Sequence, residues 1–201
     1  MDNQEKLLDE VRSYVTDLFH EYQRINLVYH NLNHTQKVVK RAGEIAANFS
    51  LSDTELFIVL VAAWFHDTGQ LEGGPKDHED RSVAIMKTFL KEKKVPKEII
   101  GKIEDCICAT KLFENPKTVL EEIVCDADTY NLGTEEFLTT DQLLKKECIL
   151  RNIPVDHWEE KTLSLLECHK YFTPYCKALL KKGRERNIEL VRSLLKVDEA
   201  K

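Results

Sequence analysis

The chain has 201 residues, of which 42% are hydrophobic and 32% are charged, a composition that suits a soluble protein with a full apolar core. The net charge of −6 argues against a protein that coats nucleic acid, because such domains are usually basic. The start MDNQEKLLDE is acidic and amphipathic and has neither the basic start nor the apolar core of a signal peptide. The longest apolar run, about ten residues, is too short to span a bilayer. We therefore expect a soluble, cytoplasmic protein that neither binds a membrane nor coats nucleic acid.

Helical periodicity dominates the sequence. Apolar residues at spacings of three and four predict an amphipathic first helix over residues 7–22, whose apolar face suits packing inside the domain or across a homodimer interface. The further predicted helices cover residues 32–49, 53–66, 77–90, 96–107, 119–132 (closed by Gly133), 134–150, 156–172 and a last segment that ends at residue 195. No long segment alternates with period two, so we expect no strands. The sequence predicts one all-α domain with its C-terminal helices packed on the core.

The segment 53–66 is apolar all the way round, which predicts a central, buried helix opened by the capping-box pattern Ser52-x-x-Glu55. It ends in His66-Asp67, a polar pair that is costly to bury unless something compensates. Gly69, in the following TGQLEGGPKD, would let the chain turn there, so that both side chains could converge on one site.

Two other segments carry residues that could join this pair. They are His34, from YHNLNHT, and an aspartate from EEIVCDADTYNLG, either Asp126 or Asp128. These two aspartates lie about 200° apart on a regular helix, so they cannot both face one ion. Two imidazoles and two carboxylates form a mixed ligand set that suits divalent first-row ions, and coordination would compensate for burying the pair. Taken singly, each residue also has an ordinary structural interpretation, as a helix-end histidine or a solvated acid.

The order and context of these residues resemble the HD-domain superfamily of metal-dependent phosphohydrolases, which carry His, then His-Asp, then Asp on a helical scaffold. YHNLNHT, AAWFHDTG and VCDADTYNLG look like the three elements. HEDRS and ICATK look like features of a subgroup of small, single-domain predicted phosphohydrolases. The likeness covers a motif-bearing core at about residues 29–133 and is looser over a C-terminal helical extension at 134–201. It implies one HD-domain helical bundle with additional C-terminal helices over residues 1–201.

The resemblance also implies the ligands and the chemistry. His34, His66, Asp67 and Asp128 would bind one or two divalent ions, with Mn, Fe, Mg, Co, Ni and Zn as candidates. Asp128 is preferred to Asp126 because the family's ligand usually follows a residue like alanine. Asp67 is the implied catalytic residue, which would bridge a second ion or orient and deprotonate the nucleophile. The implied reaction is hydrolysis of a phosphate ester or anhydride of a small molecule, nucleotides included, by metal-activated water.

Phosphoryl chemistry also needs cations around the non-bridging oxygens, and Lys111, in ATK, is the best candidate for binding the substrate. His78 and Arg81, in HEDRS, are further substrate-binding candidates, and His78 could instead assist a second metal. HEDRS is no metalloprotease signature, because Ser82 stands where HExxH has its second histidine. His30, one turn before His34, could face the same cavity or serve as a capping or supporting histidine. For Lys111, His78 and Arg81 the alternative is ordinary helix-end chemistry.

An alternative function is a non-catalytic sensor or interaction module that keeps the fold in order to bind a metal or a nucleotide. Such a module would usually lose ligands, whereas this chain keeps the whole pattern, which favours the enzyme. The loops TGQLEGGPKD and KLFENPKT would then form the pocket and select the small phosphorylated substrate.

Overall fold

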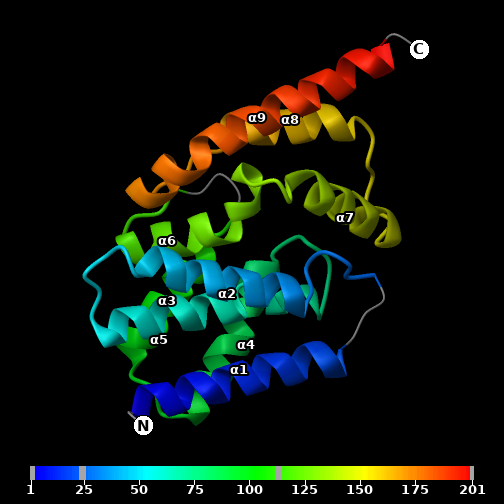
Figure 1. Cartoon of the computed structure of the whole chain (residues 1–201). Coiled ribbons are helices and arrows are strands. Elements are labelled where there is room, and N and C mark those ends of the chain that lie inside the picture. The colour runs from blue at the N-terminus through cyan, green and yellow to red at the C-terminus, as the bar shows by residue number, and fades with distance from the viewer. Residues whose placement is uncertain (1–2, 23–25, 112–114, 200–201) are drawn as a thin grey trace.

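The computed structural model describes residues 3–22, 26–111 and 115–199, and every regular element in these ranges is a helix (Figure 1). In chain order the α-helices are α1 (Asn3–Glu21), α2 (Leu32–Ala46), α3 (Asp53–Phe65), α4 (His78–Glu92), α5 (Lys97–Cys108), α6 (Val119–Asp128), α7 (Phe137–Leu150), α8 (Trp158–Cys168) and α9 (Pro174–Glu199). Two short 3₁₀ helices, η1 (Thr68–Gln70) and η2 (Tyr130–Gly133), follow α3 and α6. The predicted all-α fold is confirmed. None of the described helices combines the length and the apolar character that crossing a membrane requires.

Helix α3 is the centre of the bundle, as its sequence predicts. Ser52 caps it reciprocally, because the Ser52 hydroxyl accepts from the Glu55 amide at 3.3 Å and the Glu55 carboxylate accepts from the Ser52 amide at 2.8 Å. Helices α1, α2, α4, α5 and α6 pack around it. Ile58 and Phe65 are almost completely buried, and burying a side chain of this size stabilises the fold by roughly 1.5–3 kcal/mol.

Helices α8 and α9 lie side by side at the end of the molecule opposite α1, with α7 between them and the core (Figure 1). They share a second, much smaller apolar cluster with η2, built on four buried residues: Leu132, Phe137, Leu166 and Val191. The start of α9 also reaches the main cluster through Cys176 and Leu180. Along α7 itself only Phe137 and Glu147 are buried.

Several predicted helices are shorter than expected, among them the one over 32–49, which ends at Ala46, and the one over 134–150, which begins at Phe137. The segment predicted as one helix over 119–132 ends at Asp128, where Thr129 donates its hydroxyl to the Cys125 carbonyl at 2.8 Å and the chain tightens into η2. The helix predicted over 156–172 ends at Cys168, and His169 after it is extended.

Gly133 does not close a helix in the left-handed conformation, since no glycine has a positive φ. Its role is steric, because an added Cβ would lie 2.6 Å from Leu180 Cβ and 2.7 Å from the Leu180 carbonyl oxygen.

Candidate metal centre

Three helix ends meet at the candidate site. His34 lies in the first turn of α2, where the side chain of the N-cap residue Asn31 accepts from the His34 amide at 3.2 Å. His66 and Asp67 follow the last residue of α3, and Asp128 is the last residue of α6. Each side chain can therefore point off the end of its helix into a shared space, which residues in the middle of a helix rarely do.

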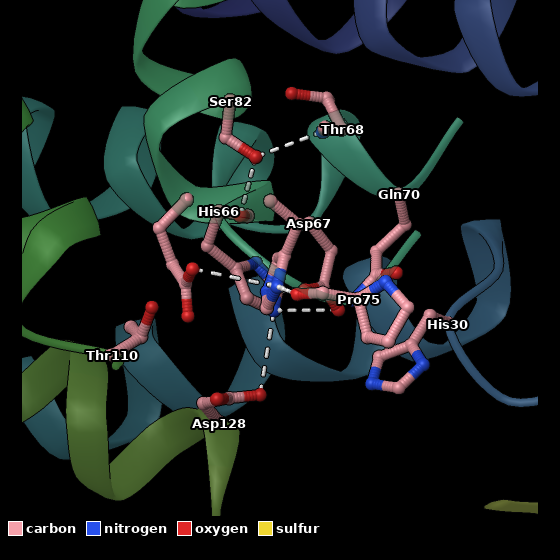
Figure 2. A network of polar contacts seen from close by, with 12 residues as sticks. His30, His66, Asp67, Thr68, Gln70, Pro75, Ser82, Thr110 and Asp128 are labelled. Atoms are coloured by element: carbon pink, nitrogen blue, oxygen red, sulfur yellow. Dashed lines mark hydrogen bonds and ion pairs between the residues drawn. The ribbon is translucent and has the colours of Figure 1, made fainter. Parts of the chain in front are cut away.

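The turn after α3 is held by Ser82 of α4. Its hydroxyl donates to the His66 carbonyl at 2.6 Å and accepts from the Gly69 amide at 2.8 Å (Figure 2). The expectation that Gly69 provides conformational freedom is wrong, because its φ is not positive. Glycine is needed because an added Cβ would lie only 2.0 Å from the His78 carbonyl oxygen, so a side chain would push α4 away.

The structure brings Asp128, and not Asp126, to the two histidines. Asp126 points to the other side of α6, where it is completely buried. Its carboxylate accepts from the Phe172 and Thr173 amides, each at 2.8 Å, and from the Thr173 hydroxyl at 2.6 Å. Asp126 therefore anchors the two residues that precede α9, and of the two aspartates only Asp128 faces the histidines.

The four side chains converge closely enough to share one ion. His34 Nε2 lies 3.2 Å from both Asp67 Oδ2 and Asp128 Oδ1, and His66 Nε2 lies 3.2 Å and 3.4 Å from the same two oxygens (Figure 2). One ligand atom from each residue can be chosen so that all lie within 4.8 Å of one another. Atoms that ligate one first-row ion at about 2.1 Å lie roughly 3 Å apart, so the spacing fits a metal.

Unsatisfied polar atoms give a second reason to place a cation here. His34 Nε2, His66 Nε2 and Asp67 Oδ2 are buried, and although each imidazole nitrogen lies 3.2 Å from that oxygen, none of the three atoms makes a hydrogen bond. Leaving one such atom unpaired costs about 1–3 kcal/mol, and three in one place point to a common partner. His66 Nδ1 contacts the Ala63 carbonyl at 2.8 Å, an arrangement that orients Nε2 toward the cluster, as is usual for a metal-binding histidine.

The electrostatics agree with this interpretation. Burial by itself lowers the pKa of His66 and of His34, but Asp67 and Asp128 more than offset it, so both pKa values are raised, that of His66 strongly. Burial likewise opposes ionisation of Asp67 and Asp128, yet the histidines hold the pKa of each carboxyl well below its usual range. The two carboxylates thus create a negative potential that a divalent cation would neutralise.

The three predicted substrate-binding residues lie in different surroundings. His78, the first residue of α4, places Nε2 3.2 Å from Asp67 Oδ1, on the opposite side of that carboxylate from His34 and His66. Lys111 donates to Asp80 at 2.9 Å and lines a cavity of about 200 Å³ that also reaches Asp128. Residues 112–114 of the predicted pocket loop KLFENPKT lie outside the described residues.

Arg81 is directed to the loop 69–76 rather than to the cluster. Its Nε donates to the Gly69 carbonyl at 2.9 Å, Nη1 donates to the Lys76 carbonyl at 2.8 Å, and Nη2 contacts the Gly74 carbonyl. With these three nitrogens on backbone carbonyls, Arg81 shapes the loop beside the site.

A cavity of about 340 Å³ lies over the cluster between the core and the C-terminal helices. Asp67, Asp128, His30 and His78 line its polar side. Its apolar wall comes from η2, α7 and α8, through Leu132, Phe137, Leu144 and Leu165. A neighbouring cavity of about 240 Å³ reaches His34 and Asp128 and is lined by three cations, Lys37, Lys40 and Arg41.

Sequence reasoning missed the contribution of α7 to the site. Glu147 is 2% exposed and holds His30, while Arg151 donates to Gln70 Oε1 at 2.8 Å and to the Gly73 carbonyl at 2.6 Å. The segment that carries both residues has no motif of its own, and its partners are separated from it by about 80–120 positions in the sequence. A glutamate and an arginine four positions apart on a helix are more often a surface pair.

The HD-CE family model matches residues 12–123. Among solved structures, a protein from Lactobacillus plantarum aligns with a TM-score of 0.70 and 18% identity, covering 100% of this chain and 99% of that one. Bacillus subtilis YpgQ in complex with ADP aligns at 0.64 and 19%, covering 96% and 95%. A predicted HD superfamily hydrolase from an uncultured Thermotogales bacterium aligns at 0.61 and 17%, covering 94% and 91%. The comparison with curated proteins found no match. At sequence identities this low, the likeness to these solved structures shows a shared fold and does not by itself show a shared activity.

Proposed function

Because the chain belongs to the HD-CE family, we propose that it is a metal-dependent phosphohydrolase that cleaves a phosphate ester or anhydride of a small molecule. The observation that carries the proposal is the convergence of His34, His66, Asp67 and Asp128 around three buried, unpartnered atoms. A structural polar cluster would satisfy these atoms with one another or with backbone groups. A cluster in which the unsatisfied nitrogen and oxygen atoms face one common point is instead suited to bind a cation there.

A divalent ion held there would lower the pKa of a water molecule and neutralise charge on a phosphoryl oxygen. Asp67 would connect this centre to the substrate cavity, because Oδ2 belongs to the cluster and Oδ1 faces His78. That second oxygen and His78 can orient a water for attack on phosphorus. Lys111 and the cations beside His34 would stabilise the non-bridging oxygens.

The cavities bear on the substrate class. A polar floor, an apolar wall and cation-lined neighbours suit a molecule that joins a phosphorylated group to an apolar body. Nucleotides have this character, and the similar fold of YpgQ was solved in complex with ADP. These observations support nucleotides as the first substrates to screen.

The decisive test is the metal content, measured by elemental mass spectrometry on protein purified without a chelator and then incubated with Mn²⁺. We expect close to one ion or more per chain in the wild type and in Asp17→Ala, whose residue is exposed on α1, and little in Asp67→Ala. Absence of metal from the wild type would overturn the ligand assignment.

If metal is present, phosphorylated metabolites are screened for phosphate release. Metal binding without any hydrolysis would favour the sensor module over the enzyme.

A further inference from the structure

Asp141, on α7, places a half-buried carboxylate in the wall of the cavity over the cluster. Two residues of α8, Trp158 and Thr162, hold it from one face, since they lie four positions apart on that helix. Trp158 Nε1 donates to both carboxylate oxygens, at 3.1 Å and 3.0 Å, and the Thr162 hydroxyl donates to Oδ1 at 3.0 Å. The carboxylate is therefore fixed in position by α8 while it lines the cavity.

These contacts leave the charge of Asp141 only partly compensated. Lys145, one turn further along α7, pairs with Glu159 at 2.8 Å, and among the described residues no ion pair includes Asp141. Burial raises the pKa of Asp141, and the hydrogen bonds from Trp158 and Thr162 offset this only in part. An ionised carboxylate offers about four acceptor positions, and Oδ2 receives only the N–H that Trp158 shares between both oxygens. Oδ2 can therefore accept a further hydrogen bond from a ligand.

Asp141 and the metal-ligand candidates lie on different walls of the same cavity. Asp67 and Asp128 stand at the ends of α3 and α6, whereas Asp141 belongs to the wall that α7 and α8 build with Leu144 and Leu165. In Figure 1 helix α7 lies between the core helices and the pair α8 and α9. A phosphoryl group bound at Asp67 and Asp128 would direct the rest of the substrate toward the apolar wall, where Asp141 offers an acceptor.

A purely structural role explains this carboxylate less well. An asparagine oxygen could join α7 to α8 by accepting from the same neutral donors, without the cost of burying a charge. A carboxylate forms stronger hydrogen bonds with N–H groups than a neutral amide does. It also penalises any ligand that lacks the N–H, because the charge then stays unpaired in an apolar surrounding. Both properties suit a residue that selects a ligand.

We propose that Asp141 determines specificity by accepting a hydrogen bond from an amino group on the base of a nucleotide substrate. The inference rests on the proposed phosphohydrolase function and extends it to the part of the substrate that does not react. An amino group donates to a carboxylate, whereas a carbonyl oxygen in its place is repelled. Asp141 therefore favours adenine, guanine or cytosine over hypoxanthine and uracil, which carry oxygen or hydrogen where those bases carry the amino group.

The test measures dissociation constants by isothermal titration calorimetry on the Mn²⁺-loaded protein. AMP and GMP are each compared with IMP, and CMP is compared with UMP. We expect the wild type to bind the amino member of at least one pair about tenfold or more tightly. In Asp141→Asn the amide oxygen can still accept from Trp158 and Thr162, which leaves an NH₂ group in place of Oδ2. The preference should then fall below about threefold or invert.

Two control variants separate specificity from the joining of α7 to α8. Trp158→Phe removes a hydrogen bond between the two helices but keeps the carboxylate, so it should retain the preference. Asp17→Asn changes an exposed carboxylate on α1 and should match the wild type. The metal content of Asp141→Asn should also match the wild type. An equal loss of preference in Trp158→Phe and Asp141→Asn would overturn the proposal in favour of a structural role.

The other outcomes distinguish this inference from the function on which it rests. Equal affinities within every pair, or an undiminished preference in Asp141→Asn, would overturn the role of Asp141 alone. A metal-loaded wild type that binds none of these nucleotides but releases phosphate from another compound would likewise overturn it and leave the phosphohydrolase in place. A wild type that neither binds metal nor releases phosphate would remove both proposals.

Discussion

Helices α1–α6 and helices α7–α9 are stabilised in different ways. The first group surrounds α3 and buries one large apolar cluster, so that its interior needs few directional contacts. The second group has a small apolar cluster of its own and meets the core both through Tyr171, Cys176 and Leu180, which join the main cluster, and through directional polar contacts. These contacts include Asp126 with the Phe172 and Thr173 amides, Glu147 with the Tyr29 and His30 amides, and Asn187 Nδ2 with the Leu132 and Thr134 carbonyls, both at 2.9 Å.

The difference explains where the site lies. Apolar packing is non-directional, so it holds helices together without fixing their exact positions. Hydrogen bonds to charged groups are directional, fix the positions of the groups they join and contribute about 1.5–3 kcal/mol each. The ligand cluster belongs to the apolar half, and the cavity above it is closed by the half that is held through polar contacts. The polar contacts at the junction therefore help to set the shape of this cavity, while the four clustered side chains are held by the apolar half.

The largest expected change in stability is at Gly183 of α9, and Gly101 of α5 is its matched control. An added Cβ at Gly183, on α9, would lie 1.8 Å from the Gly133 carbonyl oxygen, whereas a Cβ at Gly101, on α5, would meet nothing within 4 Å. We expect Gly183→Ala to lower the free energy of unfolding by about 3 kcal/mol, since backbone meets backbone there. Gly101→Ala should raise it by up to about 1 kcal/mol. Urea unfolding of both variants measures the difference, and a Gly183→Ala variant as stable as the wild type would contradict the close junction.

The sequence predicts the helices of both halves, but not the contacts that join the halves. Periodicity identifies helices in α1–α6 and in α7–α9, because a helix that packs on an apolar core repeats its apolar residues every three or four positions. The resemblance places His34, His66, Asp67 and Asp128 in one site, and the structure brings these side chains together. No comparable sequence pattern predicts the contacts of Glu147 with Tyr29 and His30, or the close approach of α4 to Gly69. A contact between segments that are distant in the sequence produces no periodic pattern in either segment. The choice between Asp126 and Asp128 likewise depends on which face of α6 meets α9.

A smaller, pH-dependent effect is expected at the junction from His169. Burial, together with the charge of Arg184, lowers the pKa of His169 to about 4. Its Nε2 contacts the Thr129 hydroxyl at 2.9 Å, and its Nδ1 is buried without a partner. A histidine whose pKa is lower in the folded state binds protons more tightly when unfolded, so its contribution to stability is complete above about pH 6.5 and is lost toward pH 4.

We therefore expect the free energy of unfolding to fall by up to about 2.8 kcal/mol from this residue between pH 7 and pH 4. In His169→Gln, which can still bond to Thr129, that part of the pH dependence should disappear. His20→Gln serves as the control, because it removes an exposed histidine. Denaturant unfolding at several pH values measures this difference. If the free energy of unfolding depends on pH in the same way in the wild type and in His169→Gln, then His169 has the same pKa in the folded and unfolded states, and the prediction is wrong.

The smallest effect on stability is expected at Lys111, where the core half faces Lys170 and Phe172 of the other half across a cavity. The Lys111–Asp80 ion pair is exposed enough that removing it should cost less than about 1 kcal/mol. If Lys111 binds phosphoryl oxygens, Lys111→Ala should instead raise KM for the phosphorylated substrate severalfold at nearly unchanged stability. Asp80→Ala separates the two roles, because it breaks the same ion pair but leaves the ammonium free to bind the substrate. Equal KM changes in both variants would mean that the ion pair, and not the lysine charge, matters at the cavity.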